Sequence, residues 1–180
     1  NGSCYINKDL KDQDISIKDG KIIEIGKIDV EAKEIFDAKD LTVLPGCIDT
    51  QTHFREPGST DTEDLHSGSR AAIVGGITSV FEMPNTNPPT STKIEFQKKL
   101  DLAKNRMYCN YAFYFGATPN NAIELADLKN LEGCCGIKLF AGSSTGNLLV
   151  QHEEDIEKVF KSSSKVVSVH SEDEEILNKN

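Results

Sequence analysis

The chain has 180 residues, of which 37% are hydrophobic and 27% charged, a composition that excludes a disordered chain and suffices for one hydrophobic core. Its net charge of -9 argues against nucleic acid or an anionic membrane as a partner, because both need a basic face. No apolar run approaches the ~20 residues of a membrane span, and five cysteines without a Cys-x-x-Cys pair fit a reducing cytoplasm, where we expect the protein.

Residues 1 to 43 are predicted to form a small β module. Residues 14 to 18 alternate between polar and apolar side chains, and residues 21 to 25 continue the pattern. Asp19-Gly20 between them is a strong signal for a tight hairpin turn. We expect this module to be a separate domain that precedes the rest of the chain.

From residue 44 to residue 180, predicted strands alternate with predicted helices. Strands are expected to end at about residues 53, 83, 115, 140 and 169, and the first of them, with its apolar run at 43 to 48, should be buried. Helices are expected over residues 60–75, 92–105, 120–131 and 153–162, with the start of another after residue 173. Alternation of this kind implies βαβ units and a parallel sheet, hence an α/β fold.

Polar side chains recur at the carboxyl ends of these strands, namely His53, Asn85, Lys138 and His170. A (β/α)8 barrel of the TIM type builds its active site from that end of its strands, whereas a dinucleotide-binding fold needs a Gly-x-Gly-x-x-Gly turn that this chain lacks. A full barrel takes ~250 residues. We therefore expect 44–180 to be the first five βα units of a barrel, from a chain that is either truncated or nicked and accompanied by its carboxyl-terminal fragment.

Two histidines and a lysine are candidate metal ligands. The imidazoles of His53 and His170 suit zinc, which can lower the pKa of a bound water to ~7. Lys138 lies between Ile137 and Leu139, so desolvation should depress its pKa and free an amine that carbon dioxide can convert into a metal-bridging carbamate. The alternatives are structural histidines and a lysine that extends to the barrel mouth.

Arg55 and Asn85 are candidate substrate-binding residues. A guanidinium binds a carboxylate through two parallel hydrogen bonds, and an amide can complete that cradle. The alternatives are a surface ion pair of Arg55 with Glu56 and a turn-capping role for Asn85. Asp49, Gln51, His53 and Arg55 share one parity and are expected to line one surface.

Taken together, these motifs closely resemble the dihydroorotases of the amidohydrolase superfamily. The resemblance covers nearly the whole chain and rests on six segments. They are Leu-Pro-Gly-x-Ile-Asp at 44–49, His-Phe-Arg-Glu-Pro-Gly at 53–58, Gly-Gly-Ile-Thr at 75–78, Met-Pro-Asn-Thr at 83–86, Gly-Ile-Lys-Leu-Phe at 136–140 and Val-His-Ser-Glu-Asp at 169–173. Hydantoinases and allantoinases share the metal scaffold but usually lack the Arg and Asn pair.

The resemblance implies a distorted barrel, a β-sandwich assembled from both chain ends, one or two zinc ions and a homo-oligomer at full length. It implies reversible cyclisation of N-carbamoyl-L-aspartate to L-dihydroorotate in pyrimidine synthesis by metal-activated hydroxide. Carried over by position, His53 is a ligand of the first metal, Lys138 the carboxylated bridge and His170 a ligand of the second metal. Arg55 and Asn85 hold the substrate carboxylate.

Two departures from the family pattern matter. The first strand normally reads His-x-His but here reads Gln51-Thr52-His53, so the first metal site is expected to bind weakly or stay empty. The second departure is the expected truncation. The resemblance implies that the remaining ligand and the general acid/base lie on strands beyond residue 180. The alternatives are a catalytically silent subunit that partners aspartate transcarbamoylase, motivated by Gln51, and a related cyclic amidase of the hydantoinase or allantoinase type.

Overall fold

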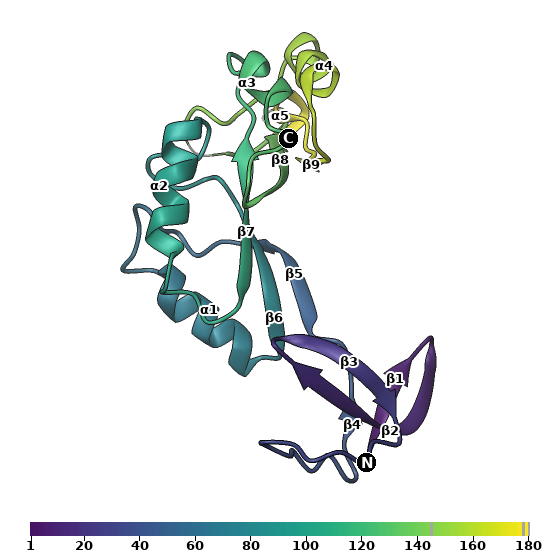
Figure 1. The fold of residues 1–180 in the computed structure, drawn as a ribbon. Coiled ribbons are helices and arrows are strands. Elements are labelled where there is room, and N and C mark those ends of the chain that lie inside the picture. The colour runs from purple at the N-terminus through teal and green to yellow at the C-terminus, as the bar shows by residue number, and fades with distance from the viewer. Residues whose placement is uncertain (145, 178, 180) are drawn as a thin grey trace. The chain divides into compact units, whose positions relative to one another are not determined.

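A computed structural model describes residues 1–144, 146–177 and 179. The chain forms two compact units, Asn1–Gly46 and Cys47–Asn180, called here the N-terminal unit and the barrel unit. Figure 1 shows the strands and helices of each unit.

The N-terminal unit is a sheet with the strand order β3-β2-β1-β4. Its strands are β1 (Gly2–Ile6), β2 (Asp9–Lys18), β3 (Lys21–Gly26) and β4 (Thr42–Val43). The first three are antiparallel neighbours, and β4 pairs with β1 in parallel. The predicted hairpin is confirmed: Asp19 and Gly20 both have positive φ, 51° and 72°, as a two-residue turn that follows the strand twist requires.

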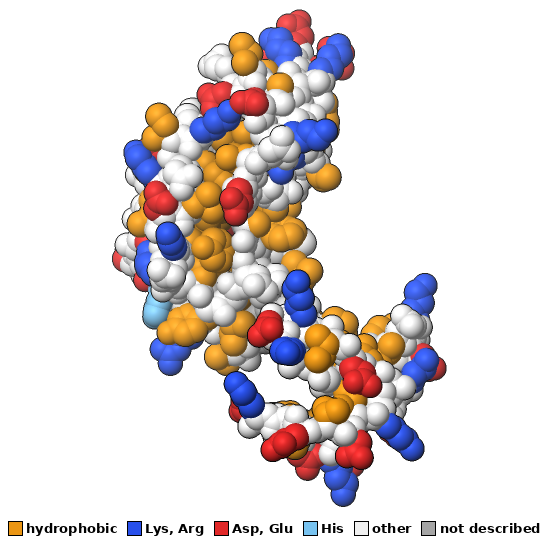
Figure 2. Space-filling view, viewed as in Figure 1, with side chains coloured by type: hydrophobic (Ala, Val, Ile, Leu, Met, Phe, Trp, Pro, Cys, Tyr) orange, Lys and Arg blue, Asp and Glu red, His pale blue; other side chains and the backbone are white. Residues whose placement is uncertain are grey.

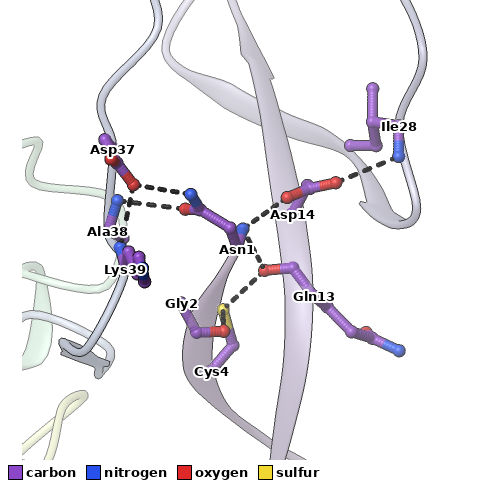
Figure 3. A network of polar contacts seen from close by, with 9 residues as sticks. All are labelled: Asn1, Gly2, Cys4, Gln13, Asp14, Ile28, Asp37, Ala38 and Lys39. Carbon is purple, nitrogen blue, oxygen red and sulfur yellow. Dashed lines mark hydrogen bonds and ion pairs between the residues drawn. The ribbon is translucent and has the colours of Figure 1, made fainter.

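Polar contacts fasten the segment between β3 and β4 to the sheet (Figure 3). The Asn1 side chain donates to Asp37 Oδ1 at 2.5 Å and accepts from the Ala38 backbone N–H at 3.1 Å. Asp14 accepts from the Ile28 N–H at 3.2 Å. These bonds order a stretch that has little apolar burial: among the described residues, Cys4 is the one buried hydrophobic side chain of this unit.

The barrel unit is a parallel sheet in which strands adjacent in sequence are adjacent in space, in the order β5-β6-β7-β8-β9. The strands are β5 (Cys47–Thr52), β6 (Ile77–Glu82), β7 (Asn110–Gly116), β8 (Cys134–Phe140) and β9 (Val167–His170). The helices are α1 (Leu65–Val74), α2 (Lys93–Ala103), α3 (Ala122–Ala126), α4 (Glu153–Ser162) and α5 (Glu174–Leu177). This is the predicted α/β fold, five βα units of a half-barrel sheet.

The core of the barrel unit lies between the central strands and the helices. Phe96 of α2 meets Phe113 and Phe115 of β7 with ring centroids 6.3 and 6.1 Å apart, and Ile137 of β8 is fully buried. The edge strand β5 differs from the sequence-based expectation of a buried strand, because Ile48 is 58% exposed. Figure 2 shows apolar side chains at the surface among charged ones.

Two helix boundaries differ from those predicted. Helix α1 begins at Leu65 rather than residue 60, because Asp64 caps it: the Ser67 N–H donates to Asp64 Oδ1 at 2.6 Å, and the Asp64 N–H donates to Ser67 Oγ at 3.3 Å. Helix α3 ends at Ala126, because the chain turns there and buries Leu128 completely. Thr92 caps α2, and α4 has the predicted bounds.

Within the described ranges, no helix is both long enough and apolar enough to cross a lipid bilayer.

Candidate metal and substrate site

All five predicted site residues belong to the barrel unit and lie at the carboxyl ends of its strands. His53 and Arg55 follow β5, Asn85 follows β6, Lys138 lies within β8, and His170 is the last residue of β9. Because the five strands are parallel, these ends share one edge of the sheet.

The Asn85 side chain lies beside the His53 imidazole and influences its pKa. The pKa of His53 is below its ordinary value, mainly because burial disfavours the charged imidazolium and next because Arg55 adds positive charge nearby; the Asn85 side chain, as an acceptor for the imidazolium, acts in the opposite direction. His53 is therefore a neutral imidazole at neutral pH, the form that binds a metal ion.

Arg55 departs from strand geometry. Strand β5 ends at Thr52, and Arg55 has a φ of 61°, in the left-handed region. The alternation predicted from Asp49 to Arg55 therefore does not continue to Arg55. The buried Glu56 carboxylate is bound by Arg106 Nη1 at 2.7 Å, by Arg106 Nη2 at 3.1 Å and by the Leu65 N–H at 2.9 Å.

A buried ion pair beneath this segment was not anticipated from the sequence. Glu82, the last residue of β6, pairs with Lys99 of α2, and the two are 1% and 0% exposed. Burial raises the pKa of Glu82 to about 7 against the attraction of Lys99, and burial lowers the pKa of Lys99. Both residues interrupt apolar patterns, Glu82 in a strand and Lys99 three residues after the buried Phe96, and that interruption was the available signal.

Lys138 is buried, as predicted, with 2% of its surface exposed. Desolvation lowers its pKa, and its Nζ lies 5.1 Å from the centre of the Phe140 ring. Across residues 1–144, 146–177 and 179, no hydrogen bond or ion pair to that Nζ is present. A desolvated amine without a counter-ion is reactive toward electrophiles.

His170 lies opposite Phe140 in the pairing of β9 with β8, with the two rings 6.1 Å apart. Its Nε2 is 2.8 Å from Glu172 Oε2. Gln51, where the family pattern has a histidine, is exposed on the edge strand β5.

The donor set fits a zinc centre only in part. Among the described residues, no group of three or more His, Cys, Asp and Glu is arranged to hold a metal ion. Two imidazoles suit zinc, but a lysine ammonium does not ligate it, so Lys138 fits as a ligand only after conversion to a carbamate.

Comparison with known proteins agrees with this architecture. A dihydroorotase of Thermococcus kodakarensis is 34% identical over 99% of this chain and 42% of its own length, and one of Methanosarcina mazei is 37% identical over 98% and 39%. An allantoinase of Escherichia coli is 37% identical over 79% of this chain and 32% of its own length. The chain thus spans about two fifths of the dihydroorotases it matches.

Among solved structures, the L-hydantoinase (dihydropyrimidinase) of Arthrobacter aurescens superposes with a TM-score of 0.83 and 27% identity, covering 99% of this chain and 41% of that one. The motif-based resemblance to dihydroorotases is confirmed by the relatives that bear that name. The model of the amidohydrolase family matches residues 42–171, and the chain belongs to that family.

Proposed function

We propose that this chain is the amino-terminal part of a zinc-dependent dihydroorotase, which interconverts N-carbamoyl-L-aspartate and L-dihydroorotate in cytoplasmic pyrimidine synthesis. The observation that carries the proposal is the closeness of the Asn85 side chain to His53, which brings the His-Phe-Arg and Met-Pro-Asn-Thr segments together. Relatives named dihydroorotase that match 98 to 99% of the chain support it.

The substrate of this reaction carries a carboxylate, and Arg55 and Asn85 are the groups that we assign to it. The guanidinium of Arg55 would bind both carboxylate oxygens, and the Asn85 amide would donate a further hydrogen bond. In a chain with a net charge of -9, such local cations are needed to attract an anionic substrate.

His53, Lys138 and His170 would hold the metal ion. The lowered pKa of Lys138 favours the neutral amine, whose nitrogen attacks carbon dioxide and then loses a proton, leaving a carbamate anion. A bound zinc ion would polarise the amide carbonyl and lower the pKa of water. Gln51 offers only a neutral oxygen, so we propose that the first metal position binds weakly. The rest of the ligand set and the general acid/base would come from strands that follow residue 180 in a longer chain.

A second candidate is a cyclic amidase that acts on a ring without a carboxylate. The 37% identity to an allantoinase and the superposition on an L-hydantoinase favour it. The presence of Arg55 and Asn85 argues against this second candidate, because a ring without a carboxylate offers the guanidinium nothing to bind.

The test is to assay the full-length protein, with zinc and after chelation, on dihydroorotate, allantoin and hydantoin. The proposal expects zinc-dependent turnover of dihydroorotate with kcat/KM well above the values for the neutral rings. A preference for allantoin or hydantoin would favour the second candidate. A zinc-replete protein inert on all three would contradict both and favour a catalytically silent subunit.

A further inference from the structure

The buried pair of Glu82 and Lys99 lies directly beneath the segment that carries His53 and Arg55. The Phe54 backbone N–H, between those two residues, donates to Glu82 Oε1 at 3.2 Å. The Phe54 ring packs against α1 at Gly68, where a Cβ would lie only 2.4 Å from Phe54 Cδ1. Phe54 is therefore held at its backbone by β6 and at its ring by α1.

Lys99 of this pair is also hydrogen-bonded to the loop that carries Asn85. Lys99 Nζ donates to the Met83 carbonyl at 2.9 Å, and the Met83 N–H donates to the Thr52 carbonyl at 2.9 Å. Asn85, two residues after Met83, lies beside His53. Glu82 and Lys99 thus connect the segment after β5 to the segment after β6.

Stability alone does not explain this pair. Removing two charges from water costs several kcal/mol per ion, and apolar residues of similar volume often replace such pairs without loss of stability. Each charge here also makes a hydrogen bond to a backbone group within two residues of a candidate site residue. These bonds fix where the site residues lie, whatever their effect on stability.

We propose that Glu82 and Lys99 are positioning residues, which set the distance of His53 and Arg55 from Asn85 by binding the Phe54 N–H and the Met83 carbonyl. The proposal rests on the function proposed above for the roles of His53, Arg55 and Asn85. Neither Glu82 nor Lys99 touches the substrate or the metal in this scheme.

Two double variants of the full-length protein test the proposal. E82Q/K99M and E82M/K99M both lack the two buried charges, but only glutamine keeps an oxygen that can accept from the Phe54 N–H. For E82M/K99M we expect zinc affinity, measured by competition with a chromophoric chelator, to fall about 10- to 100-fold, as when a group that orients a metal ligand is lost. KM for dihydroorotate should rise, and hydrogen exchange at the Phe54 amide should become at least about tenfold faster.

E82Q/K99M should stay within about threefold of the wild type in zinc affinity and in exchange at Phe54, since the acceptor for the Phe54 N–H is retained. Its KM for dihydroorotate should still rise, because the Met83 carbonyl near Asn85 loses its Lys99 donor. The matched control is E95Q/K98M, which removes a solvent-exposed ion pair on the same helix and should change none of these quantities.

Equal zinc affinity and equal Phe54 exchange in the two double variants would overturn the proposal, because the pair would then act only through packing. A wild-type protein that turns over no cyclic amide would defeat the proposed function instead. Exchange at Phe54 and zinc affinity would still report on positioning in that case.

Discussion

The centre and the edges of the parallel sheet hold their functional groups in different ways. The central strands β6 and β8 carry Glu82 and Lys138, which are both buried. Burial raises the pKa of Glu82 and lowers the pKa of Lys138, so it favours the neutral form of each. The edge strands β5 and β9 leave Ile48 58% and Val169 39% exposed, and the histidines at their ends are only half-buried. Central groups are thus fixed by the sheet itself, whereas His53 lies beside the Asn85 side chain and His170 is bonded to Glu172.

The largest effect should follow from removing the central lysine. We expect Lys138→Ala in the full-length protein to lower kcat/KM for dihydroorotate by more than about 100-fold, since loss of the proposed bridging ligand should exceed the 10- to 100-fold effect of groups that merely orient ligands. The exposed Lys129→Ala is the control. Carbon-13 NMR after incubation with labelled bicarbonate should show a carbamate signal in the wild type and none in Lys138→Ala. A carbamate signal that survives Lys138→Ala would refute the assignment.

The second largest effect concerns the pH dependence of stability at the sheet centre. The raised pKa of Glu82 means that its protonation stabilises the folded state fully below pH 4.5 and that this contribution is lost as pH rises through about 7. Lys99→Met removes the ammonium that opposes this shift. As pH rises from 5 to 8, the free energy of unfolding of Lys99→Met should therefore fall by about 3 kcal/mol more than that of E82Q/K99M, which has no carboxyl at this position. Urea unfolding of both variants measures the difference, and parallel pH profiles would show that Glu82 is ionised throughout.

At the edge of the sheet, Arg55→Ala should distinguish charged from neutral rings. Loss of a charge-assisted hydrogen bond of about 1.5 to 3 kcal/mol predicts a decrease of about 10- to 100-fold in kcat/KM for dihydroorotate, with little change for a neutral ring. The exposed Arg70→Ala provides a matched control. Equal losses on both kinds of substrate would argue against a carboxylate-binding role for Arg55.

The smallest effect should come from α1, the helix against which the Phe54 ring packs. Asp64→Ala removes the N-terminal cap of α1 and should cost about 1 kcal/mol, read as a lower melting temperature. Ser59→Ala, just before the helix start at residue 60 expected from the sequence, should leave the melting temperature unchanged. The reverse result would place the start of α1 at residue 60.

The periodic parts of the chain were predictable from local sequence. The hairpin at Asp19-Gly20, the Thr92 cap and the bounds of α4 follow from turn chemistry, capping and hydrophobic spacing. The start of α1 was missed because several residues between 59 and 64 are suitable caps, and only the reciprocal bond to Ser67 selects Asp64. The exposure of β5 was missed because apolar composition does not tell a central strand from an edge strand.

The candidate site residues could be named from the sequence, but the ion pairs that hold their segments in place could not. His53, Arg55, Asn85, Lys138 and His170 could be named because polar groups at strand ends are conspicuous in sequence. The pair of Glu82 with Lys99 and the pair of Glu56 with Arg106 join different elements. Which charges meet inside the fold depends on helix and strand packing, and no local pattern encodes it.

At Arg55 the left-handed backbone favours glycine for stability, whereas the proposed carboxylate binding requires the arginine side chain. A side chain with a Cβ costs about 1 to 2 kcal/mol in this conformation, and glycine would relieve that cost. Arg55→Gly should therefore give a protein at least as heat-resistant as the wild type that no longer selects carboxylate-bearing rings. Selection for thermal stability alone would erode the carboxylate-binding role proposed for Arg55, so engineering the fold for robustness should leave residue 55 unchanged.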